Sequence, residues 1–187
     1  MTEQETKLRN IINKLGGDVV FYEYGNENYY QGLANNKKFY IDTLGDANIE
    51  NVFYHELTHF LRQNNNDIYM KEIQPIVNEI ASDYDYQEVI FNYANSASEE
   101  FDVRNLNGNR QLELAEEVVA DYVAGFYGDL ETSYGLPIET IQKIRTSMDK
   151  ILNQNSKIES NVLPTAQKQN TPSMAVIKNF QYINIYI

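Results

Sequence analysis

The sequence predicts an α+β protein that is mainly helical, with a small antiparallel sheet packed on a histidine-bearing helix and a later glutamate-bearing helix. Apolar residues recur at helical spacing through most of the chain up to residue 153, and two short β-branched and aromatic runs lie between residues 19 and 43. With 187 residues, 42% of them hydrophobic, the chain is long enough for one compact domain and short for two. We therefore expect one domain over residues 1–153 and a polar linker and tail over residues 154–187.

The first half of this domain is predicted to contain a helix, two strands and the histidine-bearing helix. Apolar residues at helical spacing, followed by Gly16-Gly17, predict an amphipathic helix over residues 3–15. The predicted strands, which we expect to pair antiparallel, are residues 19–24 and 38–43. The histidine-bearing helix is predicted to begin between residues 46 and 51 and to end near residue 63, before three consecutive asparagines.

The second half is predicted to be helical. One or two helices are expected between residues 67 and 96, where Pro75 must start, kink or break the first of them. A polar loop is predicted at residues 97–110. The two remaining predicted helices are residues 111–127, ending at Gly128, and residues 137 to about 152, with Pro137 in the first turn.

The carboxy-terminal residues differ in composition from the domain. From about residue 154 the chain is rich in Asn, Gln, Ser, Thr and Pro, which is typical of a linker, whereas residues 180–187 alternate as a strand does. Three placements of this tail stay open: at a sheet edge, over a cleft, or disordered.

Composition excludes several classes of function. A formal charge of −12 disfavours nucleic acid as a partner, because binding to phosphates depends on Lys and Arg. No apolar run approaches the length of a membrane span, and residues 1–5 lack the basic and apolar regions of a secretory signal, so we expect a cytoplasmic protein without a membrane contact. The absence of cysteine leaves His, Asp, Glu and water as the available metal ligands.

The most informative feature is the placement of the two histidines. They are the only two in the chain and stand four residues apart in His55-Glu56-Leu57-Thr58-His59. Two residues placed at random in such a chain fall four apart in roughly one case in a hundred, so chance explains the spacing poorly. On a helix, residues i and i+4 project from one face, so both imidazoles can reach one metal ion.

A catalytic zinc site needs a third protein ligand and an open position for water. Position 62 is Arg and position 65 is Asn, so no third histidine follows and the third ligand must be a carboxylate. The helix over residues 111–127 is the best source, because it combines strong periodicity with acidic residues. On it Glu117 is the predicted ligand and Asp121, on the same face, the predicted hydrogen-bond partner of a ligating histidine.

Other acidic residues of that helix rank behind these two. Glu116 points about 100° away from Glu117, and Glu113, one turn earlier, is the weaker candidate for supporting a ligand. Glu56 lies on the same edge as the histidines without being needed as a ligand, so it is the predicted catalytic base. It would take a proton from the zinc-bound water and pass it to the leaving amine of a peptide.

These residues resemble the gluzincin zinc metallopeptidases, in which two histidines of His-Glu-x-x-His and a glutamate from a later helix bind zinc. Through Glu116-Glu117-Val118-Val119-Ala120-Asp121, the chain most resembles the compact metallopeptidase domains of polyvalent proteins from phages and mobile elements, and more distantly the ImmA/IrrE-like peptidases. The resemblance covers roughly residues 50–153 and implies a zincin-like fold. Glu116 stands where thermolysin-like gluzincins carry Asn, and the oxyanion must be stabilised by a tyrosine, for which Tyr134 is conveniently placed, by an arginine or by the metal alone.

Two function classes follow. The first is a zinc endopeptidase acting on a protein or peptide, and the second is a non-catalytic zinc domain that binds a protein partner. A metal-free structural protein is a third possibility. Substrate, oligomeric state and membership in a longer protein are not determined by the residues.

Overall fold

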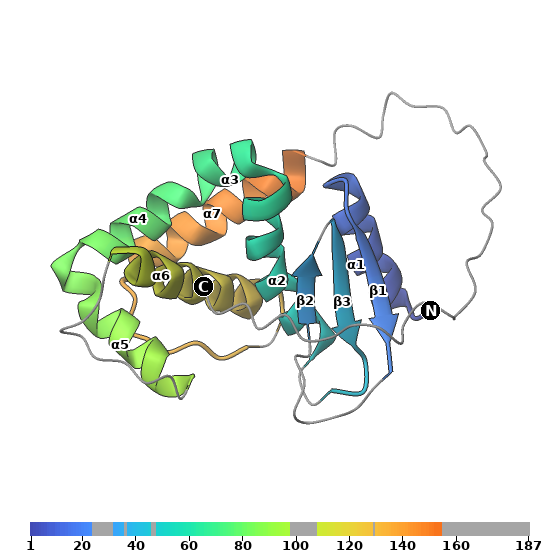
Figure 1. Cartoon of the computed structure of the whole chain (residues 1–187), viewed down its shortest axis with the longest axis horizontal. Coiled ribbons are helices and arrows are strands. Elements are labelled where there is room, and N and C mark those ends of the chain that lie inside the picture. The colour runs from blue at the N-terminus through green and yellow to red at the C-terminus, as the bar shows by residue number, and fades with distance from the viewer. Residues whose placement is uncertain (24–31, 36, 46–47, 98–107, 129, 155–187) are drawn as a thin grey trace.

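The first helix and a three-stranded sheet form the amino-terminal part of the fold in the computed structural model, which describes residues 1–23, 32–35, 37–45, 48–97, 108–128 and 130–154 (Figure 1). Helix α1 spans Glu3–Lys14 and begins at a capping box. The Thr2 hydroxyl accepts a hydrogen bond from Glu5 N at 3.1 Å, and the Glu5 carboxylate accepts one from Thr2 N at 2.7 Å. Helix α1 buries Leu8 and Ile12.

The sheet is mixed, with the strand order β1-β3-β2. Its strands are β1 (Asp18–Tyr22), β2 (Gly32–Asn35) and β3 (Lys38–Asp42). β2 and β3 pair antiparallel, whereas β1 and β3 pair parallel. The antiparallel expectation is therefore wrong for the two strands predicted from sequence. The unpredicted strand β2 forms the short, antiparallel connection to β3, which leaves β1 to pair with the opposite edge of β3 in the parallel direction.

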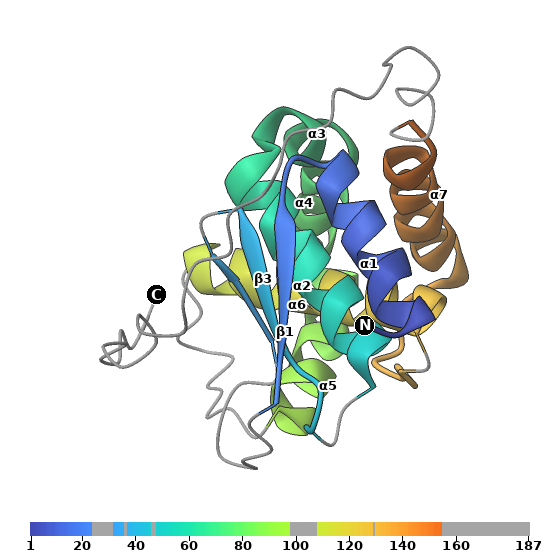
Figure 2. The same ribbon diagram turned by 90° about the vertical axis from the view of Figure 1, so that its right-hand side faces the viewer.

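One face of the sheet holds the histidine-bearing helix α2 (Ile49–Asn64). Phe39 of β3 packs edge-on against Phe53 and Phe60, with ring centroids 5.1 Å apart in both pairs. Such aromatic pairs stabilise a contact beyond the area they bury. Helix α1 lies on the same side of the sheet as α2 (Figure 2), and Lys7 of α1 pairs with Glu50 of α2 at 2.9 Å.

The remaining helices gather on the other side of α2 from the sheet (Figure 1). They are α3 (Asn66–Glu72), α4 (Gln74–Ser82), the 3-10 helix η1 (Tyr84–Tyr86), α5 (Gln87–Ser96), α6 (Gly108–Tyr127) and α7 (Ile138–Gln154). Three α-helices thus replace the one or two expected between residues 67 and 96. Pro75 lies in the first turn of α4, where its missing N–H costs no intrahelical hydrogen bond.

One hydrophobic cluster contains residues of the sheet, of α1 and α2 beside it, and of the helices on the far side of α2. It includes Leu8 of α1, Phe39 of β3, Phe60 of α2, Val119 of α6 and Met148 of α7. Within the described ranges, no helix is both long and apolar enough to cross a membrane. The predicted tail beyond residue 154 and most of the predicted loop at residues 97–110 lie outside the described residues.

Candidate metal centre

Helices α2 and α6 pack against each other and bring together the residues that sequence spacing singles out. Asn48 caps α2 by accepting a hydrogen bond from Glu50 N at 2.9 Å, which fixes where the helix begins. On α6, the buried Ala120 and Ala124 lie within about 60° of Glu117 around the helix axis. Small side chains let two helices approach closely, so side chains at the contact can meet across it.

His55, His59 and Glu117 form a group that can hold a metal ion. The Nε2 atoms of the two imidazoles lie 3.3 Å apart. One oxygen of Glu117 lies 3.2 Å from Nε2 of His55 and the other lies 3.5 Å from Nε2 of His59. Four ligands at about 2.0–2.1 Å from a tetrahedral zinc ion stand about 3.3–3.4 Å from each other. The two nitrogens have the separation of ligands on one tetrahedral ion, and each lies at a similar distance from a different Glu117 oxygen. With one ligand atom taken from each residue, the three atoms lie within 4.8 Å of one another.

Each histidine is held from behind by a carboxylate. Nδ1 of His55 donates to Oδ1 of Asp121 at 2.8 Å, and Nδ1 of His59 donates to Oε1 of Glu116 at 2.8 Å. A carboxylate can only accept, so the proton of each neutral ring resides on Nδ1, and Nε2 carries the lone pair. Both lone pairs then face Glu117, which is the arrangement of a carboxylate–histidine–metal site.

The charges of the group explain the shifted pKa values. Burial alone lowers the pKa of His55, but hydrogen bonds to Asp121 and Glu117 outweigh burial and raise it to about 10. Burial likewise opposes the charged form of His59, whose bonds to Glu116 and Glu117 raise its pKa to about 9. Burial raises the pKa of Glu117, and the two imidazoles lower it by more. Three carboxylates thus favour positive charge at this point, supplied by protons or by a metal ion.

Glu116 is the most buried member of the site, with 4% of its side-chain surface exposed. Besides His59 it contacts Arg62, whose guanidinium lies 2.9 Å from Oε2. The buried Tyr69 hydroxyl also donates to Oε2, at 3.1 Å. A buried carboxylate is costly unless it is paired and hydrogen-bonded, and these three partners meet that need.

Asp121 has a second partner on its other oxygen. The Tyr134 hydroxyl donates to Oδ2 at 2.6 Å. Each histidine therefore begins a chain of contacts that runs through a carboxylate to a tyrosine: His55–Asp121–Tyr134 on one side and His59–Glu116–Tyr69 on the other. Tyr134, which sequence suggested only as an oxyanion donor, points its hydroxyl at Asp121.

The two other residues predicted for the site, Glu56 and Glu113, lie on different helices. Glu56 is half-buried on α2, one residue after His55 and three before His59, so it projects from the helix beside the ligand face. Glu113 lies near the start of α6, where its carboxylate is 3.4 Å from the Arg110 guanidinium.

Sequence reasoning missed the role of Glu116, together with Arg62 and Tyr69. Helical angles put Glu116 about 100° from Glu117, and that remains true. This angle does not show that His59, one turn after His55 on α2, lies on the Glu116 side of α6. An arginine three residues after His59, and a glutamate inside an otherwise apolar segment of α6, were the available signals.

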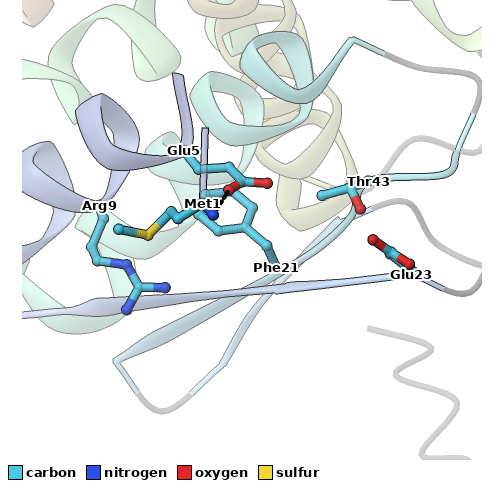
Figure 3. A pocket seen from close by; sticks show the side chains of 6 residues that line it. All are labelled: Met1, Glu5, Arg9, Phe21, Glu23 and Thr43. Carbon is cyan, nitrogen blue, oxygen red and sulfur yellow. Dashed lines mark ion pairs between the residues drawn. The ribbon is translucent and has the colours of Figure 1, made fainter. Parts of the chain in front are cut away.

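A separate open pocket lies where α1 meets the sheet (Figure 3). Its volume is about 250 Å³, and none of its lining residues belongs to the metal group. The lining residues are Met1, Glu5, Arg9, Phe21, Glu23 and Thr43. Because the lining contains both acidic side chains, Glu5 and Glu23, and a basic one, Arg9, its charge does not indicate a class of ligand.

Comparisons of the chain with protein-family models, with curated proteins and with solved structures find no match.

Proposed function

We propose that this protein is a zinc-dependent peptidase of the gluzincin type, with His55, His59 and Glu117 as ligands and Glu56 as the base. The observation that carries the proposal is the convergence of the three residues: one ligand atom from each lies within 4.8 Å of the others, and the two Nε2 atoms are 3.3 Å apart, as ligands of one tetrahedral ion are. Two imidazoles and one carboxylate are a ligand set that suits zinc and leaves a fourth position for water.

Zinc held by these ligands would lower the pKa of a bound water and polarise the carbonyl of a substrate. Asp121 and Glu116 hold the two imidazoles with their lone pairs aimed at one point. Glu56 takes the proton of the attacking water and delivers it to the nitrogen of the scissile amide, which then leaves as an amine. A protein or peptide is the substrate class that this chemistry supports.

The test is cleavage of a peptide library by the purified protein, read by mass spectrometry with and without a chelator. We expect about one zinc per chain by elemental analysis and cleavage that the chelator abolishes. Glu56→Gln should retain zinc and slow cleavage by about 100-fold or more, because general-base catalysis contributes about 10²–10⁴-fold.

Glu50→Gln is the matched control, since it removes the same charge from the same helix. Glu50 pairs with Lys7 on the face toward α1, and its loss should leave cleavage unchanged. Cleavage by Glu56→Gln at the wild-type rate would remove Glu56 as the base. Stoichiometric zinc without any cleavage would instead favour a zinc domain that binds a partner, and a protein that takes up no zinc would contradict the metal site itself.

A further inference from the structure

The two chains of contacts behind the histidines differ in depth. Tyr69, at the end of the His59 chain, is fully buried, whereas Tyr134, at the end of the His55 chain, is only half-buried. The histidines follow the same order, with 25% of the His55 side chain exposed against 14% for His59. The His55 side of the metal group is therefore the one nearer to solvent.

Tyr134 is held firmly although it lies between two helices rather than within one. Its backbone carbonyl accepts a hydrogen bond from Nδ2 of Asn92, in α5, at 3.1 Å. Its ring packs edge-on against Tyr93 of α5 and Tyr122 of α6, with centroids 5.5 and 6.1 Å away. Contacts from two helices thus fix the direction in which the Tyr134 hydroxyl points.

Asp121 uses its two oxygens for different partners. Oδ2 accepts from the Tyr134 hydroxyl at 2.6 Å, and Oδ1 accepts from Nδ1 of His55 at 2.8 Å. A carboxylate bound at one oxygen only can rotate about its side-chain bonds. When both oxygens accept hydrogen bonds, the carboxylate keeps one orientation, and the imidazole bonded to it keeps its orientation as well.

We propose that Tyr134 is a positioning residue for the metal: it fixes the Asp121 carboxylate, which keeps Nε2 of His55 aimed at the ion. The segment between α6 and α7 thereby acts on metal affinity without contacting the ion. This inference rests on the proposed metal site, but it does not depend on peptidase activity.

The experiment compares Tyr134→Phe with Tyr127→Phe. The Tyr127 hydroxyl also donates to an aspartate, Asp149, at 2.6 Å, so both variants lose a tyrosine–aspartate hydrogen bond of equal length. Zinc affinity is measured by competition with a chelator, and the visible absorption of the cobalt-substituted protein reports ligand geometry. Unfolding in urea is followed for both variants.

We expect Tyr134→Phe to weaken zinc binding by about 3- to 10-fold, below the 10- to 100-fold typical for loss of a direct partner of a ligand. Its cobalt spectrum should shift, while Tyr127→Phe keeps wild-type affinity and spectrum. In an Asp121→Asn background, Tyr134→Phe should add nothing, because it acts through that carboxylate.

Equal affinity and equal spectra for the two tyrosine variants would overturn the inference, as would a full additional effect in the Asp121→Asn background. These results leave the proposed function standing. Conversely, wild-type protein that binds zinc and cleaves no peptide overturns the peptidase and leaves the role of Tyr134 to be decided by affinity. A wild-type protein that binds neither zinc nor cobalt overturns both.

Discussion

At the scale of single residues, the feature that defines the group His55, His59 and Glu117 is that the lone pairs of its nitrogen and oxygen atoms face one another. Nδ1 of each neutral histidine donates a hydrogen bond to a carboxylate, so no hydrogen lies on either Nε2 atom. The two Nε2 atoms, 3.3 Å apart, and the Glu117 oxygens then converge with no hydrogen between them. Such a group repels itself unless a cation lies at its centre. In the proposed zinc site, the carboxylates that orient the histidines would therefore be as necessary as the ligands.

Replacing either orienting carboxylate should weaken zinc binding by about 10- to 100-fold. The two variants are Asp121→Asn and Glu116→Gln, with affinity measured by chelator competition. Glu116→Gln should also lower the free energy of unfolding more, because it leaves the Arg62 guanidinium without its carboxylate. Glu113→Gln is the control, since its partner is Arg110, and it should bind zinc as the wild type does. A loss of affinity in that control would place Glu113 among the residues that support the site.

At the scale of elements, α2 is held between the sheet and α6, and its position depends on close contacts on the sheet side. Gly17, which follows α1, is one of them. A Cβ atom at Gly17 would stand 2.7 Å from Phe60 Cζ and 2.9 Å from Cγ1 of Ile12. Phe60 is the residue after His59, so the space that a glycine leaves at position 17 sets where the histidine-bearing helix lies.

Gly17→Ala should therefore reduce the free energy of unfolding by about 1–3 kcal/mol, the usual cost of overpacking a well-filled core. Gly108→Ala, at the start of α6, is the matched control, because no atom of the described residues lies within 4 Å of its added Cβ. Its stability should stay within about 0.5 kcal/mol of the wild type. Urea unfolding of both variants measures the difference, and equal stabilities would contradict the tight contact between Gly17 and Phe60.

At the scale of the whole molecule, the raised pKa values couple protonation of the site to stability, and the proposed zinc would add a second coupling. The pKa values of His55 and His59 are raised to about 10 and about 9 without metal, from an ordinary value of about 6.5 in the unfolded chain. A raised folded-state pKa contributes stability below the unfolded value and loses it as the pH rises through the folded value. The metal-free protein should therefore become less stable between about pH 6.5 and pH 10.

Unfolding in urea with a chelator present should show a loss on the order of 5 kcal/mol between pH 6.5 and pH 9, because each histidine contributes up to about 1.4 kcal/mol per pH unit. With excess zinc the trend should reverse, because the metal displaces protons from the imidazoles and binds more tightly as the pH rises. A double variant, His55→Gln with His59→Gln, should lose most of this dependence. Metal-free stability that is flat over this range would mean that the two histidines titrate near their ordinary pKa.

The sequence by itself determined the local parts of the site. His55, Glu56 and His59 share an edge because four residues make about one helical turn, and the same rule puts Glu117 and Asp121 on one face of α6. The helix boundaries near Gly16 and Gly128 follow from local chemistry as well. The α+β class, mainly helical with a small sheet, follows from periodicity, which depends only on neighbouring residues.

Only the tertiary structure decided how these parts face one another. The direction of β1 depends on the unpredicted strand β2, which takes the antiparallel place beside β3. The contact of Glu116 with His59 depends on how α6 is rotated against α2, and the contact of Tyr134 with Asp121 depends on where the segment after α6 returns. Contacts between distant segments are fixed by the packing of many side chains at once, and no local spacing in the chain carries that information.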